Sequence, residues 1–273
     1  MYELPEAMVV AKQVGTTLKG KTIVTVIINQ HPHKFAFFNR PLADYERLLR
    51  GKTVIDGLCH ASRIAIRFAE VDLLVWDGAR LKYSERPEDV PDKHQLLLRF
   101  ADESTLSVSV QMYGGIELWE SGDPENIYMR MARIKPNPLT DAFTPAHFHS
   151  LFDEQSGKLS LKAFLATKQR IPGLGNGILQ DILLVAGMHP KRKANTLRES
   201  EVTRLYAAIV TTIKAMATSG GRDGETDLFG QAGTYRTLAK RHARSQPCPQ
   251  CGGALVKEAY LGGAIYYCEN CQK

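Results

Sequence analysis

The sequence lacks the long apolar runs and the repeats that mark several classes of protein. No stretch approaches the roughly 20 apolar residues of a membrane-spanning helix, and we find no signal peptide. Internal repeats and low-complexity tracts are also missing, which argues against a solenoid or a disordered chain. We expect a globular, cytoplasmic protein with no membrane partner.

Cysteine is scarce outside the C-terminal tail. Of the five cysteines only Cys59 lies elsewhere, in an apolar stretch, and we interpret it as a buried small hydrophobe rather than a nucleophile. The other four form the pattern Cys248-x2-Cys251-x16-Cys268-x2-Cys271. Two such knuckles can place four thiolates around one Zn²⁺. The alternative is two disulfides, which an intracellular compartment disfavours.

The segment between the two cysteine pairs predicts a β-hairpin. Gly252 to Tyr267 alternates apolar and polar residues around Gly262-Gly263. The tail is therefore typical of a zinc ribbon with one structural Zn²⁺ per chain, and the metal would supply most of the folding energy of so small a module. This pattern indicates a metal and says little about function.

The balance of charge is mildly basic. Thirty-five Lys and Arg residues stand against 29 Asp and Glu, so the formal net charge is +6. This favours a polyanionic partner but does not identify one, because many soluble enzymes are mildly basic. A chain of 273 residues is long enough for two domains besides the tail.

The N-terminal half is rich in predicted strands. Pro5 to Lys19 has apolar residues at helical spacing and stops at Gly20, which predicts a helix. Short β-branched or alternating runs follow, separated by turn clusters. The predicted strands are Lys21–Asn29, Thr53–Cys59, Ile64–Phe68, Leu73–Trp76, Gln95–Phe100 and Thr105–Met112. We expect an opening helix and an antiparallel β-sandwich over residues 1–134.

From Asp141 the pattern becomes helical. Apolar residues recur three or four positions apart in four segments, Thr144–Phe152, Ser160–Ala166, Asn176–Gly187 and Ser200–Ser219. The polar, glycine-rich segment from Gly220 to Asp227 follows, and we expect it to be mobile. The chain thus reads as an α+β multidomain protein, with a helical domain over residues 135–244 and a zinc finger over residues 245–273.

A glycine-rich turn joins two of the predicted helices. It runs from Lys168 to Gly177 and starts the next helix at Asn176, and a helix N-terminus offers free N–H groups to a phosphate. Glu3-Leu4-Pro5-Glu6, this turn, Ala186-Gly187-Met188-His189-Pro190 and the cysteine pairs occur in one order over almost the whole chain. Together they resemble the formamidopyrimidine-DNA glycosylase/endonuclease VIII family of base-excision repair enzymes.

The resemblance implies a β-sandwich, a helix–two-turns–helix domain and a zinc finger that bind damaged double-stranded DNA by base flipping. We expect a monomer associated with the nucleoid. Asn176 occupies the place of the family's asparagine that binds a phosphate beside the extruded nucleotide, and Lys168 and Arg63 are further DNA-binding candidates. The family's wedge residues correspond to Met112 and Tyr113; the alternative is that both belong to the core of the sandwich.

The family's nucleophile is missing from this chain. Family enzymes attack the sugar with the secondary amine of an N-terminal proline, whereas Tyr2 stands here and Met1 is expected to be retained. The amine is thereby displaced by about 3.8 Å along the backbone, and misplacement of roughly 1 Å already impairs catalysis. The Met1 amine can take the place of the family's proline amine only if the N-terminus folds back differently. The family's lysine in the first hairpin is also lost, at Ser62.

Two carboxylates near the N-terminus remain as catalytic candidates, Glu3 and Glu6. Both also suit a role in capping the first helix, where acidic residues are favourable. Without an amine nucleophile, Glu3 or, as a second choice, Asp77 would activate water to hydrolyse the N-glycosidic bond. We therefore predict a hydrolytic, monofunctional DNA glycosylase that does not cut the strand. The alternative is a catalytically silent protein that binds damaged DNA.

Overall fold

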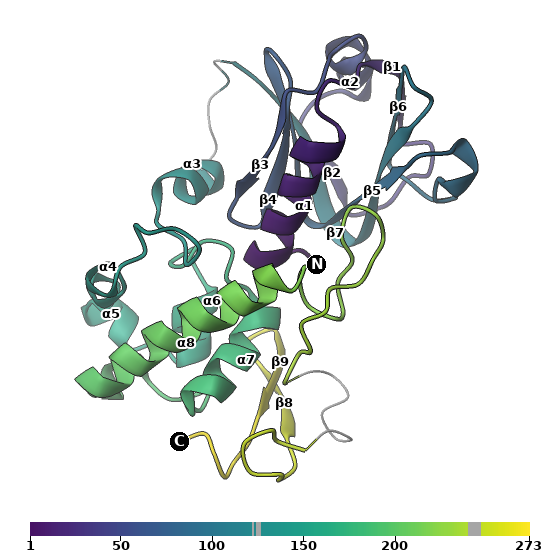
Figure 1. Ribbon diagram of the computed structural model, residues 1–273. Coiled ribbons are helices and arrows are strands. Elements are labelled where there is room, and N and C mark those ends of the chain that lie inside the picture. The colour runs from purple at the N-terminus through teal and green to yellow at the C-terminus, as the bar shows by residue number, and fades with distance from the viewer. Residues whose placement is uncertain (122, 124–126, 240–246) are drawn as a thin grey trace. The chain divides into compact units, whose positions relative to one another are not determined.

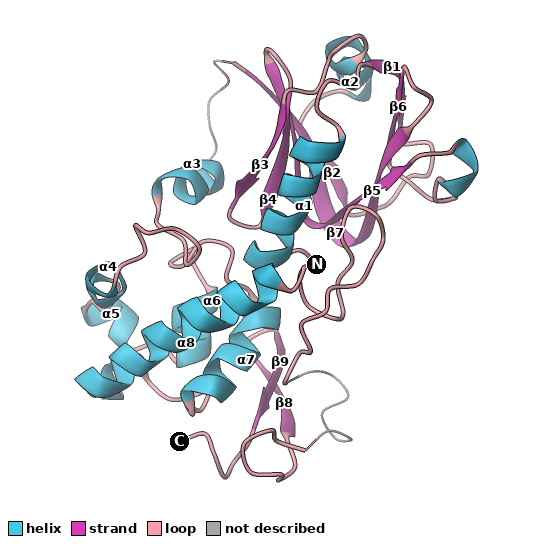
Figure 2. Ribbon diagram, in the orientation of Figure 1, coloured by secondary structure: helices cyan, strands magenta, loops and turns pink. Residues whose placement is uncertain are grey.

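The computed structural model describes residues 1–121, 123, 127–239 and 247–273, without the side chains of residues 127 and 128. These residues form two compact units, the first from residues 1–130 and 220–234 and the second from residues 131–219 and 235–273. Strands concentrate in the first unit and helices in the second (Figure 2). The predicted boundary at 244/245 lies outside the described residues, and the three-domain division stays a prediction.

The first unit is built on one strongly curved sheet, in which the described residues form seven strands. The order is β1-β6-β7-β5-β4-β3, with β2 parallel to β7 and the other pairs antiparallel. The strands are β1 (Ile23–Ile28), β2 (Ala36–Phe38), β3 (Asp56–His60), β4 (Arg63–Arg67), β5 (Val71–Ser84), β6 (Leu96–Phe100) and β7 (Thr105–Glu120). Since β6 pairs with the first part of β7 and β4 with the first part of β5, the two long strands connect the halves of the predicted sandwich.

Helix α1 (Leu4–Thr17) covers β3 and β4 of the sheet (Figure 1). Its buried face carries Val10 and Val14, four residues apart, a spacing that places both on one face of a helix. Close approach depends on Gly57 of β3, where an added Cβ would lie 2.2 Å from the carbonyl oxygen of Ala11. The predicted opening helix is confirmed, and its apolar face forms part of the core of the first unit.

Two strands of the first unit are much longer than predicted, and three short elements were not predicted. Gly78 and Gly114 resemble turn signals, but both are paired within or beside the β5–β7 ladder, where their lack of a side chain permits close backbone contact. Strand β2 and helix α2 (Leu42–Leu49) flank Pro41, the N-cap residue of that helix. A short 3₁₀ helix, η1 (Pro87–Asp89), follows β5.

The second unit contains the helices and a two-stranded hairpin. Its elements are the second half of α3 (Ile127–Ile134, which crosses from the first unit at residue 131), α4 (Pro145–Ser150), α5 (Glu154–Gly157), α6 (Leu161–Ala166), α7 (Asn176–Ala186), η2 (Ala194–Thr196), α8 (Glu199–Thr218), β8 (Val256–Tyr260) and β9 (Gly263–Tyr267). Helix α7 packs on α8 and ends at Gly187 in the left-handed conformation, φ 67°. The four predicted helices are confirmed, and no described helix is both long and apolar enough to cross a membrane.

The expectation of a mobile loop after α8 is wrong. Residues 220–234 belong to the first unit, and in Figure 1 this light-green segment lies beside the N-terminus. Leu228 is fully buried in the core of the first unit, and its carbonyl accepts the backbone N–H of Tyr83 at 2.8 Å. Gln13 of α1 donates to Asp227 at 2.8 Å. Glycine content suggested mobility, but these tertiary contacts hold the segment.

Candidate functional site

The first turn of α1 carries both carboxylates that the sequence analysis singled out. Glu3 is the N-cap residue, and its side chain accepts the backbone N–H of Glu6. The Glu6 side chain in turn accepts the backbone N–H of Glu3 at 3.1 Å. This capping box satisfies two N–H groups at the start of the helix. The capping interpretation is confirmed for both residues, so any catalytic role must be added to a structural one.

Arg222, in the loop after α8, is the main partner of Glu6. Its Nε and Nη2 atoms donate to the two carboxylate oxygens of Glu6 at 2.9 and 2.8 Å, and both side chains are buried. Its Nη1 atom lies 3.7 Å from Glu3 Oε1. Burial by itself raises the pKa of Glu6, but the hydrogen bonds and charge of Arg222 outweigh it and hold the pKa below its usual value. Glu6 is therefore a weak base.

The N-terminal amine is held by Glu225. The Met1 nitrogen donates to the two oxygens of that carboxylate at 2.7 and 2.8 Å, and Arg80 donates to the same group. Burial lowers the pKa of the Met1 amine, and the Glu225 carboxylate opposes this. Tyr2 is only 2% exposed, so its side chain anchors the start of the chain in the core of the first unit. The amine is thus engaged in an ion pair.

Asp77 is a partly buried carboxylate at a break in the sheet. A β-bulge follows it in β5, and its φ is 54°, in the left-handed region that non-glycine residues seldom adopt. Burial raises the pKa of Asp77, while the charges of Arg63 and the N-terminal amine lower it. The Arg63 guanidinium and the N-terminal amine must therefore lie near the Asp77 carboxylate. Strained, desolvated carboxylates of this kind are typical of functional sites.

The candidate wedge residues project from the middle of β7. Met112 is 68% exposed and Tyr113 is 41% exposed. The alternative that they belong to the core of the sandwich is therefore wrong. Burial and the nearby charge of Asp77 raise the pKa of Tyr113, which places that side chain beside the carboxylate. A wedge role for the pair stays a prediction.

Helix α7 positions the candidate phosphate-binding asparagine in the second unit. Asn176 lies exposed in the first turn, and its Nδ2 donates to the carbonyl oxygen of Ala264 in β9 at 3.2 Å. One turn later the buried Gln180 donates to the same carbonyl at 3.1 Å and accepts the backbone N–H of Tyr266 at 3.1 Å. Because both strand groups are satisfied by one helix, the hairpin is fixed against the N-terminal turn of α7.

The turn before α7 is backbone-strained. Lys168 and Gln169 both have positive φ, 56° and 47°, although neither is glycine. The carbonyl of Gln169 accepts a hydrogen bond from Lys135 at 3.1 Å. Lys168 is exposed. Consecutive left-handed residues are costly and persist where the surrounding structure holds them, so the backbone of this turn is fixed at Lys168.

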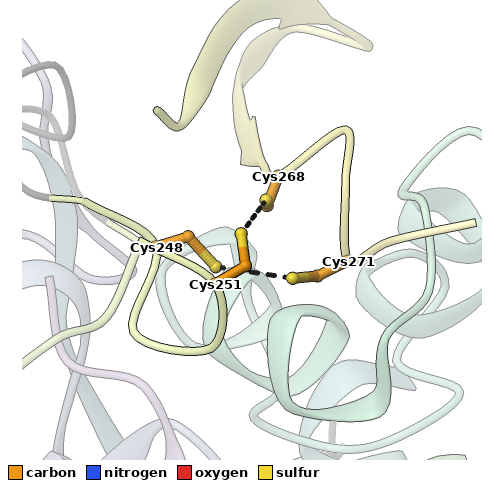
Figure 3. Close-up of side chains that lie close together, drawn as sticks. All are labelled: Cys248, Cys251, Cys268 and Cys271. Atoms are coloured by element: carbon orange, nitrogen blue, oxygen red, sulfur yellow. Dashed lines mark hydrogen bonds between the residues drawn. The ribbon is translucent and has the colours of Figure 1, made fainter. Parts of the chain in front are cut away.

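The four tail cysteines converge on one point (Figure 3). Their Sγ atoms all lie within 4.8 Å of one another, with Cys251 to Cys268 at 3.5 Å and Cys248 to Cys271 at 3.8 Å. A disulfide requires about 2.05 Å. Four thiolates about 2.3 Å from one tetrahedral Zn²⁺ would stand about 3.8 Å apart. The donor set and its spacing fit zinc, with these residues as the ligands, and do not fit two disulfides.

The metal-binding end of the ribbon also packs on α7. Cys248 and Cys268 share a small core with Leu184. Gln250 donates to the carbonyl oxygen of Leu184 at 3.1 Å, and Gln272 donates to that of Met188 at 2.8 Å. Cys59, in contrast, lies in the first unit, where burial raises its pKa to about 12. It is therefore a thiol packed against the core rather than a nucleophile.

The sequence analysis missed the three charged residues that hold the N-terminus: Arg80, Arg222 and Glu225. The last two lie in the segment that was expected to be mobile, and their charge within a glycine-rich stretch was the one available signal. Arg80 lies in β5 with no distinguishing neighbours in sequence. Contacts such as Met1 to Glu225 span 224 residues, and no local pattern predicts them.

Comparison with known proteins agrees with the motifs. The formamidopyrimidine-DNA glycosylase H2TH domain matches residues 134–226. Proteins named formamidopyrimidine-DNA glycosylase from Bacillus anthracis and Neisseria meningitidis serogroup A are each 28% identical to this chain. The match covers all of this chain and 99% and 100% of those relatives.

Solved structures share the fold. A complex of Lactococcus lactis Fpg with DNA containing an abasic site superposes with a TM-score of 0.84 at 20% identity, over 99% of each chain. A complex of the same protein with DNA containing N7-benzyl-Fapy-dG gives a TM-score of 0.85 at 19% identity. The order of motifs, the matched domain and the full-length similarity agree: this chain contains a match to the H2TH domain of formamidopyrimidine-DNA glycosylase and is similar over its whole length to proteins of that name.

Proposed function

We propose that this protein removes damaged bases from DNA by hydrolysis and leaves the strand uncut. The observation that carries the proposal is the pairing of the Met1 amine with Glu225 at 2.7 and 2.8 Å. A Schiff base requires a free lone pair on nitrogen. Burial lowers the pKa of the Met1 amine, but Glu225 opposes this effect and holds the amine in two hydrogen bonds. Relatives of the same length carry the name formamidopyrimidine-DNA glycosylase, which supports base removal as the activity.

Asp77 is the side chain that we assign to water activation. In the reaction water adds to the sugar C1′, the C–N bond to the base breaks, and the departing base takes up a proton. A carboxylate whose pKa is raised accepts a proton from water more readily, and burial raises that of Asp77 whereas Arg222 lowers that of Glu6. Glu3, which the sequence analysis placed first, would stabilise positive charge on the sugar, and Glu6 would fix Arg222 beside it.

DNA binding is assigned chiefly to the second unit. The exposed Asn176 and the N-terminal N–H groups of α7 suit a phosphate, and Lys168 adds a positive charge nearby in sequence. Arg63, Met112 and Tyr113 are the contacts proposed for the first unit. The zinc ion, held by the four cysteines, would act structurally by fixing the hairpin against α7, since four thiolates leave no open coordination position for chemistry.

A catalytically silent reader of damaged DNA is the second candidate. The ion pairs favour it, because Arg222 neutralises Glu6 and lies near Glu3, and Glu225 engages the amine. Such a protein would need the binding residues of both units but no base-releasing group. Asp77 then would have no catalytic part, and its bulge would serve only the fold.

The test is a strand-scission gel on duplexes with formamidopyrimidine, oxidised, alkylated and abasic sites, developed with and without hot alkali. We expect bands only after alkali, and their loss in Asp77→Asn, which suits the left-handed backbone as well as aspartate. Bands without alkali would contradict the uncut strand, and full activity of Asp77→Asn would move the base elsewhere. No bands beside tight lesion binding would favour the silent reader.

Glu225→Gln tests the role of the ion pair directly. Intact-mass measurement should first confirm that Met1 is retained. We then expect no borohydride-trapped protein–DNA cross-link with the wild type, because the amine is engaged. Loss of the Glu225 charge should release the amine, whose pKa burial already lowers, and make a weak cross-link detectable. Strong trapping of the wild type would show that the Met1 amine acts as a nucleophile despite Glu225.

A further inference from the structure

A row of flat side chains crosses five strands of the first unit. His60 of β3 pairs with Arg63 of β4. Ile64 of β4 pairs with Val75 of β5, and continuing this antiparallel register by one residue sets Arg63 opposite Trp76. Trp76 faces Gly115 of β7, and Gly115 faces Phe37 of β2. Residues directly opposite each other point to the same face of a sheet. Imidazole, guanidinium, indole and phenyl groups therefore share one face.

Gly115 allows the rings in this row to meet. An added Cβ at Gly115 would lie 2.0 Å from Cε2 of the Trp76 indole, so the ring lies over the glycine. Phe37 reaches it from the opposite side: the two rings are parallel within 3°, with centroids 6.2 Å apart. The Arg63 guanidinium lies over the same indole at 5.3 Å. We call Arg63, Trp76 and Phe37 the stacking row.

The stacking row is bordered by exposed apolar and cationic groups. Phe37 and Phe35 are each 47% exposed, and Tyr113 is 41% exposed. The Lys34 ammonium lies 5.4 Å from the centroid of the Phe35 ring. Exposed large aromatic side chains that lie close together on a protein surface mark a binding site, and here cations accompany two of the rings.

We propose that the stacking row binds unpaired nucleobases, so that the first unit holds a single-stranded stretch of nucleic acid. Bases stack on exposed aromatic rings and on arginine whatever their sequence, and cations between the rings neutralise the phosphates. Sheets that present aromatic side chains in this way are a recurring platform for single strands. Protein interfaces also use aromatic and arginine side chains, but planar groups interleaved with positive charge match the bases and phosphates of a nucleic acid.

The first test uses the intrinsic fluorescence of Trp76. The chain contains two tryptophans, so a Trp119→Phe protein reports Trp76 alone. Titration with a ten-residue oligothymidylate should quench this emission, because a base stacks on the indole. A matched oligomer of ten abasic residues carries the same phosphates without bases and should leave the emission nearly unchanged. Equal quenching by both oligomers would overturn the proposal.

Phe37→Ala is the decisive variant. Stacking energies predict roughly tenfold weaker binding of oligothymidylate, with binding of fully paired duplex unchanged. Phe229→Ala is the matched control, since Phe229 is 43% exposed in the first unit but contacts Tyr83 outside the stacking row. Unchanged affinity of Phe37→Ala, or dissociation of a protein dimer in that variant, would refute base binding. Undamaged single strands serve as the probe, so this inference stands or falls separately from base removal.

Discussion

The N-terminal site of the first unit and the α7–ribbon site of the second unit are built from opposite kinds of contact. The first is held by charges: Met1 pairs with Glu225, and Glu6 with Arg222. The second is held by neutral hydrogen bonds from Asn176 and Gln180 to strand β9. Uncharged side chains thus join α7 to strand β9 in the second unit, whereas ion pairs fix the N-terminus in the first.

The largest effect that tests the contrast between these two sites is expected on zinc binding by the ribbon. Cys268→Ser removes one of four zinc ligands, and zinc binding is worth about 10–16 kcal/mol to small zinc modules. We expect metal content to fall from one zinc per chain to near zero by elemental analysis, together with at least tenfold weaker DNA binding. The control substitution Cys59→Ser, in the first unit, should leave the zinc content of the protein at one per chain. A zinc content unchanged by Cys268→Ser would contradict the four-thiolate site.

The second effect concerns the buried charges of the first unit. Glu6→Gln leaves Arg222 buried without its main partner, which costs about 3–5 kcal/mol. Urea unfolding should show this loss. A Glu6→Gln, Arg222→Met double variant should recover part of it, because it removes the unpaired charge. If the single variant is as stable as the wild type, the ion pair does not hold the N-terminus.

The Glu6–Arg222 ion pair also makes the stability of the protein depend on pH in the acidic range. The pKa of Glu6 lies below its ordinary value of 4.5 in the folded protein, so the unfolded chain binds the proton more readily. Its contribution is therefore complete above pH 4.5 and is lost as the pH falls towards the folded pKa. The free energy of unfolding of Glu6→Gln should decline less steeply than that of the wild type in this range. Parallel curves would show that other groups set the limit.

A smaller effect distinguishes two residues of the second unit. Asn176→Ala removes a neutral hydrogen-bond donor, which should weaken DNA binding by about 1 kcal/mol without changing the salt dependence. Lys168→Gln removes a charge and should reduce the slope of log affinity against log salt by about 0.9. Fluorescence anisotropy with plain and lesion-containing duplexes measures both. An unchanged slope for Lys168→Gln would remove that residue from the phosphate contacts.

The smallest effect is expected at Asp77. Because burial raises its pKa above 3.8, the folded protein binds this proton more tightly than the unfolded chain does. Stability from this group is complete below pH 3.8 and is lost as the pH rises through the folded pKa. Asp77→Asn should therefore unfold with the wild-type free energy at low pH and be more stable, by less than about 1 kcal/mol, at neutral pH. Equal stability at both pH values would contradict a desolvated carboxylate.

Local patterns predicted most of the fold. Helices at 3.6-residue periodicity and the shorter strands were found close to their observed bounds, because one buried face imposes its period on the sequence. Strand β2 and helix α2 were not predicted, and strands β5 and β7 were predicted too short because Gly78, Gly114 and Gly115 resemble turns. These glycines instead make room for a neighbouring strand or for Trp76, a contact between segments distant in sequence.

The candidate sites were predicted to different extents for the same reason. Four cysteines at metal spacing and the turn at Asn176 carry their chemistry in a few neighbouring residues. The loop after α8 does not. Its Arg222 and Glu225 gain their roles only from Glu6 and Met1, more than 200 residues away.

The sequence by itself therefore indicated the family resemblance, the four cysteines suited to zinc and the tyrosine at position 2, since each depends on which residue stands at a position. The tertiary structure decided how the N-terminus is held. It brought Glu225 to the amine, Arg222 to the first turn of α1, and Phe37 and Arg63 to the two sides of Trp76. Such pairings depend on the free energy of burying charges and rings together, which the whole fold sets and no single segment encodes.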